Sequence, residues 1–202
     1  MTVGSEIHRR RSIRLNGYDY SLAGAYFVTV CTQDRLCLFG NVNNEQMTLN
    51  QAGQMVYEQW SELPKRFPES AIDEFTMMPN HLHGILIIND NETTQSVGAS
   101  LVGAQNKVDK TNKAGTRPAP TLGEIVGAFK SITTNEYIRG VKQHDWPSFP
   151  GKLWQRNYGA CPERSRRERV IRDEDELNRI REYIIYNPVK WVDDADNPKN
   201  WK

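Results

Sequence analysis

The chain has 202 residues, which fits one domain, and its net charge of +1 gives no general sign of a nucleic-acid partner. Hydrophobic residues make up 38% and charged residues 25%, and the mean hydropathy is −0.69. No apolar run is long enough to cross a bilayer, and residues 1–6 lack the apolar stretch of a signal peptide. We therefore expect a cytoplasmic protein that does not contact membranes. Three cysteines without a CxxC pair argue against a disulfide framework and against a cysteine zinc site.

The first half of the chain predicts two strands beside a helix. A polar arm over residues 1–20 precedes a strand over 25–32, which is rich in β-branched and aromatic residues. Apolar residues at near-helical spacing predict a helix over 47–63, which Pro64 ends. A second strand is expected over 72–78.

The strand pattern continues after a short break. Pro79-Asn80 separates the second strand from a strongly apolar strand over 81–88, which indicates an antiparallel pair. Residues 91–119 are rich in small and polar residues and predict a flexible loop.

Two helices dominate the second half. Thr121 is a candidate N-cap with Glu124 in capping-box position, and the helix should end near Gly140. Residues 141–170 have an irregular pattern, and a last helix is expected over 173–187. This order of elements predicts one α+β domain over residues 1–202, with helices packed on an antiparallel sheet.

The triplet His81-Leu82-His83 is the first candidate site. On a strand, residues two apart point to one face, so both imidazoles lie together and can bind one metal ion. Ile85 and Ile87 continue that face. Alone the triplet is a weak signal, because two histidines can equally be polar residues at a strand end. A structural zinc site would need two further Cys or His ligands.

A tyrosine on the last helix is the second candidate. Tyr183 and Asn187 are four apart and therefore share one helix face. The phenol can attack a phosphodiester, and the Asn187 carbonyl oxygen can bind the same metal. Pro188 disfavours helical backbone at Asn187, which places it at the frayed end. By spacing alone, Tyr183 and Tyr186 fit better as packing residues.

Taken together, four motifs resemble the REP-associated tyrosine transposases, single-tyrosine members of the HUH superfamily. The resemblance spans about residues 12–191. Its segments, in order, are Met78-Pro79-Asn80-His81-Leu82-His83-Gly84, Phe129-Lys130-Ser131, Leu153-Trp154-Gln155-Arg156-Asn157-Tyr158, and Tyr183-Ile184-Ile185-Tyr186-Asn187-Pro188-Val189-Lys190.

The resemblance implies a ferredoxin-like fold with the histidine pair on a central strand. It implies that His81, His83 and Asn187 bind Mg²⁺ or Mn²⁺, and that Tyr183 is the nucleophile. The implied reaction cleaves and rejoins single-stranded DNA through a 5′-phosphotyrosine. Imidazole ligands make Mn²⁺ at least as suitable as Mg²⁺.

The resemblance also implies single-stranded DNA and REP-like DNA hairpins as partners, with a monomer favoured over a dimer. Local basic clusters can contact phosphates at a low overall charge, although each cluster fits solvated surface charge equally well. Tyr18, Tyr20 and Trp154 are candidates for base stacking, with a core role favoured for Trp154. The candidate DNA-binding residues are Arg9, Arg10, Arg11, Arg14 and Lys130.

One segment departs from the family pattern. Residues 159–169 replace an acidic residue and a histidine usual in relatives, and 160–167 resemble a translated palindromic repeat. We interpret this as an in-frame insertion into a surface loop that can impair activity. Two alternatives to a DNA strand transferase therefore stay open. One is a catalytically silent DNA-hairpin-binding protein, and the other is a metal-dependent hydrolase that uses water.

Overall fold

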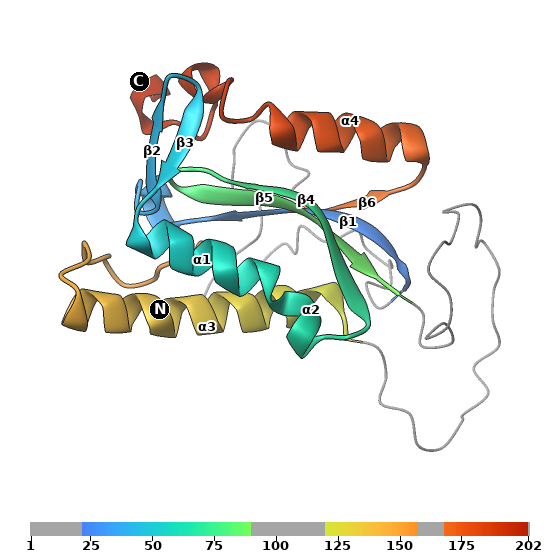
Figure 1. Ribbon diagram of the computed structural model, residues 1–202, viewed down its shortest axis with the longest axis horizontal. Coiled ribbons are helices and arrows are strands. Elements are labelled where there is room, and N and C mark those ends of the chain that lie inside the picture. The colour runs from blue at the N-terminus through green and yellow to red at the C-terminus, as the bar shows by residue number, and fades with distance from the viewer. Residues whose placement is uncertain (1–21, 90–119, 157–167, 202) are drawn as a thin grey trace, which may run out of the picture.

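The computed structural model describes residues 22–89, 120–156 and 168–201, and has three layers with a sheet in the middle (Figure 1). Within these ranges, no helix is both long and apolar enough to cross a membrane. The strands are β1 (Gly24–Cys31), β2 (Gly40–Asn43), β3 (Gln46–Leu49), β4 (Ser70–Met77), β5 (His81–Ile88) and β6 (Glu168–Ile171). The helices are α1 (Gln51–Ser61), α2 (Leu63–Arg66), α3 (Leu122–Gln143) and α4 (Glu174–Ile185), with 3₁₀ turns η1 (Gln33–Arg35), η2 (Trp191–Asp193) and η3 (Pro198–Asn200).

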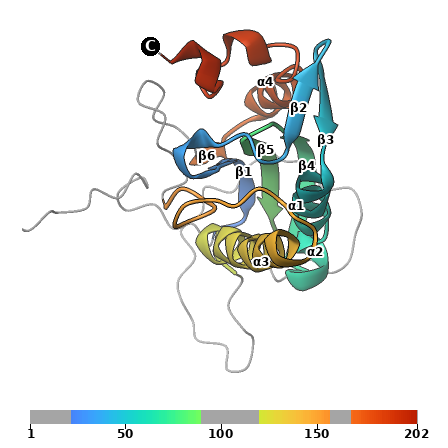
Figure 2. The ribbon, with the colours of Figure 1, turned by 90° about the vertical axis from the view of Figure 1, so that its left-hand side faces the viewer.

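The main sheet has the order β4-β5-β1-β6, and every neighbouring pair is antiparallel. With α1 and α3 as the two crossovers, this is the βαββαβ connection of a ferredoxin-like fold. Helices α1, α2 and α3 cover one face, and α4 lies on the other (Figures 1 and 2). The predicted α+β fold and the central position of the histidine strand are confirmed.

Strand β5 is apolar on both faces because it lies between two packed layers. Leu82, Leu86 and Ile88 join the large core that β1 and β5 form with α1 and α3. Ile85 and Ile87 point the other way, into a smaller cluster beneath α4. His81 and His83 continue this second row, as the alternation of side chains along a strand requires.

Gly84 lets helix α1 approach the strand that carries the histidines. A Cβ added there would lie 2.6 Å from Cζ2 of Trp60 and 3.2 Å from Cβ of Phe75. The Trp60 indole therefore packs directly on the β5 backbone. The glycine after His83 thus has a packing role on the face opposite the imidazoles.

The predicted helix over 47–63 is wrong at its start. Met47 and Leu49 lie in β3, which pairs with β2 as a hairpin. Its two-residue turn, Asn44-Glu45, has positive φ at both residues, the backbone that tight hairpins need. Helix α1 begins only after the N-cap Asn50, whose side chain accepts from the amide of Gly53 at 2.8 Å.

Other element boundaries also differ. Helix α3 continues past Gly140 to Gln143, because Gly140 is an interior helical residue on which the Trp146 indole packs. Strand β6 begins inside the segment 141–170, for which no regular structure was predicted, and pairs with β1. Helix α4 ends at Ile185, two residues earlier than expected. The predicted arm, the loop over 91–119 and most of the insertion lie outside the described residues.

Candidate active site

The two imidazoles lie side by side under the end of α4. Both are buried, and their ring centroids are 4.5 Å apart. The apolar cluster beneath α4 ends just before them, so two polar rings continue an otherwise apolar row. The predicted pairing of His81 and His83 on one face of the strand is confirmed.

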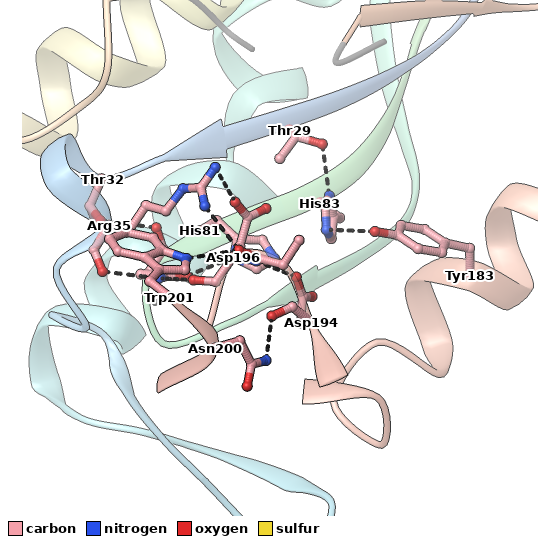
Figure 3. Close-up of polar contacts among 12 residues, drawn as sticks. Thr29, Thr32, Arg35, His81, His83, Tyr183, Asp194, Asp196, Asn200 and Trp201 are labelled. Atoms are coloured by element: carbon pink, nitrogen blue, oxygen red, sulfur yellow. Dashed lines mark hydrogen bonds and ion pairs between the residues drawn. The ribbon is translucent and has the colours of Figure 1, made fainter. Parts of the chain in front are cut away.

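Tyr183 reaches this pair from the opposite layer. Its hydroxyl lies 3.3 Å from Nε2 of His83, and its ring stands edge-on to the imidazole at 5.2 Å (Figure 3). The side chain is 41% exposed, so the hydroxyl borders both the histidine and solvent. Tyr186 is 55% exposed and lies at the C-cap of α4. The structure thus places Tyr183, the predicted nucleophile, at the histidine pair.

Helix α4 is fixed at its start and along one side. The Asp173 side chain caps it by accepting from the amide of Glu176 at 2.7 Å. Leu177, Ile180 and Ile184 pack onto the sheet. These contacts set the rotation of the helix and therefore the direction of Tyr183 one turn after Ile180.

A bidentate ion pair ties α4 to the edge strand β4. Arg181 donates through Nε to Oδ1 of Asp73 at 2.9 Å and through Nη2 to Oδ2 at 2.5 Å. The Arg181 hydrogen bonds hold the pKa of Asp73 below its usual value, against the effect of partial burial. The pair anchors the helix two residues before Tyr183.

Each histidine also has a polar neighbour on its Nδ1 side. Thr29 lies directly opposite His83 on β1, and its Oγ1 is 2.8 Å from Nδ1 of that ring. Asn80 precedes His81, and its Oδ1 is 2.8 Å from Nδ1 of that ring. Both imidazoles therefore have their Nδ1 edges held by the protein.

Asn80 is in turn held by the C-terminal segment. Its amide nitrogen donates to the carbonyls of Arg35 at 3.0 Å and Asp196 at 2.7 Å. Those two residues form a buried ion pair of 3.0 Å, and Trp201 lies against the guanidinium at 4.9 Å (Figure 3). The segment after α4 therefore folds back onto the turn that precedes the histidine strand.

Along the chain, Asn187 lies between two residues whose rings contact the histidines. Upstream, Tyr183 contacts His83, and downstream the Trp191 ring lies 6.0 Å from His81. Asn187 is buried and outside α4, where its backbone N–H donates to the backbone carbonyl of Ile184. Its Oδ1 has no hydrogen-bond partner among the described residues.

These donors fit a divalent cation that prefers nitrogen and oxygen ligands. A buried side-chain carbonyl oxygen without a hydrogen-bond partner among the described residues, such as Oδ1 of Asn187, is the kind of group that a metal ion satisfies. The described residues contain no cluster of three His, Cys, Asp or Glu side chains suited to a metal. Asn187, which the family resemblance implies as the third ligand, therefore stays a prediction.

The predicted DNA-binding residues are only partly placed. Arg9, Arg10, Arg11 and Arg14 lie outside the described residues. Lys130 lies on α3, across the sheet from α4, and its ammonium donates to the carbonyl of Gln155 at 2.8 Å. This contact anchors the segment that carries Trp154.

The core role favoured for Trp154 is confirmed. Its ring packs against Phe39 and Phe129, and its indole nitrogen donates to Oγ1 of Thr133 at 2.9 Å. The residue is only 5% exposed, which leaves no free face for a base.

Several residues of the site did not emerge from the sequence. Thr29 requires the register between β1 and β5, and Asp196 requires knowledge of how the C-terminal segment folds back. Asn80 had a usable signal, because it directly precedes the first histidine in a Pro-Asn turn.

Comparisons with known proteins support the fold and reveal a family relationship. No family model matches the chain. An uncharacterized protein of Haemophilus influenzae is 39% identical over 188 residues, which cover 93% of each chain. A solved structure described as the REP-associated tyrosine transposase bound to a REP hairpin has a TM-score of 0.51 and 16% identity. That comparison covers 90% of this chain and 78% of the other.

A putative transposase from Deinococcus radiodurans is 15% identical, with a TM-score of 0.40, and the match covers 87% of this chain and 96% of the other. The structural match to the REP-associated transposase shows the fold that the motif resemblance implies. The chain therefore belongs to the same family as the Haemophilus influenzae protein and has the fold of the solved REP-associated tyrosine transposase.

Proposed function

We propose that this protein is a transposase-like enzyme that cleaves and rejoins single-stranded DNA, with Tyr183 as the nucleophile. The observation that carries the proposal is the 3.3 Å approach of the Tyr183 hydroxyl to Nε2 of His83, from residues 100 apart in sequence. The fold of the REP-associated tyrosine transposase supports a transposase-like function, and the four motifs support its chemistry.

In the proposed reaction the Tyr183 oxygen forms a bond to a DNA phosphorus while the bond from phosphorus to the 3′ oxygen breaks. The phenol proton leaves to solvent, which reaches the half-exposed side chain, and the departing 3′ oxygen takes up a proton. The strand end stays on the enzyme as a 5′-phosphotyrosine. Because the phosphodiester energy is kept, a 3′-hydroxyl can attack that linkage and rejoin the DNA.

The cation proposed for this site is Mg²⁺ or Mn²⁺, held by His81, His83 and Asn187. When bound, it would neutralise charge on the phosphate oxygens and orient the phosphodiester. The protein's part is to hold both imidazoles rigidly through Thr29 and Asn80 and to place the Tyr183 phenol beside His83. Rigid positioning of this kind is what a displacement at phosphorus requires.

DNA hairpins with adjoining single strands are the proposed substrates. The solved transposase with this fold is described as bound to a REP hairpin. The basic residues near the N-terminus are proposed to contact the DNA backbone. We propose that the enzyme acts as a monomer in the cytoplasm.

The deciding experiment is an adduct assay on a single-stranded hairpin substrate, with Mn²⁺ and with a chelator. Wild type should form a covalent protein–DNA product that Tyr183→Phe abolishes. Tyr186→Phe is the matched control and should keep the adduct, because that ring lies at the exposed helix end.

Other outcomes of this assay would support one of the alternative functions. An adduct that survives in Tyr183→Phe would disprove the nucleophile. Cleavage without any adduct in that variant would indicate a hydrolase that uses water. Hairpin binding by wild type without metal-dependent cleavage would indicate a catalytically silent binding module, as expected if the insertion at 159–169 impairs the site.

A further inference from the structure

The side-chain amide of Asn80 has only one orientation that satisfies its surroundings. Its nitrogen faces two backbone carbonyls, those of Arg35 and Asp196, which can only accept hydrogen bonds. Turning the amide over would place its carbonyl oxygen against both of them. The oxygen Oδ1 is therefore the atom that faces Nδ1 of His81 at 2.8 Å.

This orientation determines where the His81 ring carries its proton. A carbonyl oxygen accepts and cannot donate, so Nδ1 of the neutral ring must be the N–H group. Nε2 is then the nitrogen with the lone pair. A metal ion can bind only a nitrogen with a free lone pair, so the ring is set to coordinate through Nε2.

The acceptor is fixed by segments that are far apart in the sequence. Asn80 is fully buried, and its two carbonyl partners belong to residues joined by the Arg35–Asp196 ion pair. Trp201 closes the arrangement by lying over the guanidinium and donating its indole N–H to the carbonyl of Ala195 at 3.0 Å (Figure 3). The C-terminal segment thus helps to fix the orientation of the Asn80 side-chain amide.

We infer that Asn80 is a positioning residue that holds His81 as the Nδ1–H tautomer, with the C-terminal segment as its support. The role of this tautomer in metal binding rests on the proposed function, but the tautomer itself does not. It is a property of the metal-free protein and can be measured without DNA or activity.

The test is long-range ¹H–¹⁵N correlation NMR on histidine-labelled, metal-free protein at a pH of about 8, above the ordinary histidine pKa of about 6.5. Wild-type His81 should show a protonated Nδ1 and an unprotonated Nε2. A protonated Nε2 in wild type would overturn the inference without any variant. Loss of adduct formation with the expected tautomer intact would count against the proposed function alone.

Two variants distinguish a positioning role of Asn80 toward His81 from a purely structural role. Asn80→Ala removes the acceptor, so the ring should populate the Nε2–H form and the affinity for Mn²⁺, followed by electron paramagnetic resonance, should fall about 10- to 100-fold. Asn80→Asp keeps an acceptor at Nδ1 but sets an oxygen against the two carbonyls that the Asn80 nitrogen bonds. It should therefore lose stability, yet retain the wild-type tautomer and bind Mn²⁺ more tightly than the alanine variant. An alanine variant that folds with an unchanged tautomer and affinity would make Asn80 purely structural.

Asn50→Ala is the matched control. Asn50 also uses its side-chain amide on backbone groups, accepting from Gly53 at 2.8 Å and donating to the carbonyl of Leu38 at 3.0 Å. These side-chain hydrogen bonds go to Gly53 and Leu38 and not to either histidine. This variant should lose stability and leave the His81 tautomer and the Mn²⁺ affinity unchanged.

Discussion

The ion pair between Arg181 and Asp73 should contribute measurably to the stability of the helix that carries Tyr183. Two charge-assisted hydrogen bonds of 2.9 and 2.5 Å join α4 to the edge strand β4. The Asp73 side chain is 14% exposed and the Arg181 side chain 32%, so solvent screens the pair only in part. Asp73→Asn should therefore lower the free energy of unfolding by about 1–2 kcal/mol at neutral pH, after discounting for that exposure.

The effect should depend on pH in one direction. Because the pKa of Asp73 is lowered in the folded protein, its contribution is fully present above the unfolded pKa of about 3.9. It is lost as the pH falls through the lower, folded pKa. The stability difference between wild type and Asp73→Asn should thus be constant from neutral pH to about pH 5 and shrink at more acidic pH.

Thermal and urea denaturation across that pH range are the measurements. A loss of about 1–2 kcal/mol corresponds to a fall in Tm of about 2–8 °C for a chain of this size. Glu136→Gln breaks the exposed pair with Arg139 on α3 and should cost no more than about 0.5 kcal/mol. A pH-independent loss in Asp73→Asn, or a loss no larger than the control's, would refute the reasoning.

Two further predictions use matched substitutions on the two sides of the sheet. Gly84→Ala should destabilise the protein by about 1–3 kcal/mol in thermal denaturation, because its Cβ would meet the indole of α1 at 2.6 Å. Gly127→Ala, with no atom within 4 Å of the added Cβ, should instead raise Tm, and equal effects would contradict this packing argument. Thr29→Val should weaken Mn²⁺ binding at least about tenfold by removing the polar neighbour of His83. Thr133→Val, which removes a buried hydroxyl on the opposite side, should lower stability but leave Mn²⁺ affinity unchanged.

The sequence predicted those parts of the fold that depend on local patterns. The bounds of β5 and the capping box of α3 were predicted correctly, because alternation and caps are properties of neighbouring residues. The hairpin of β2 and β3 was missed because two of its apolar residues, Met47 and Leu49, happen to lie at near-helical spacing from the apolar residues of α1. Strand β6 was missed because its four residues gain their stability from pairing with β1, which is not visible locally.

For the candidate site too, the sequence predicted only the features that depend on neighbouring residues. The face shared by His81 and His83 follows from strand geometry, and the position of Asn187 beyond the helix follows from Pro188. The approach of Tyr183 to His83 depends on how α4 crosses the sheet, which spacing alone does not give. From the sequence, only the four ordered motifs indicated that the histidine pair and Tyr183 belong to one site.

The two faces of the sheet explain why the candidate site depends on polar contacts. On the α1 and α3 side a large core secures the helices. Among the described residues, the cluster beneath α4 is smaller: Ala25, Ile85 and three residues of the helix are buried, and Phe27, Ile87 and Ile171 pack against them partly buried. This small cluster and the Asp173 cap set the rotation of α4. The bidentate ion pair adds a directional contact, because its geometry is more specific than that of apolar packing. Weakening the Arg181–Asp73 pair should therefore reduce adduct formation by Tyr183 more than the modest loss of stability alone would predict.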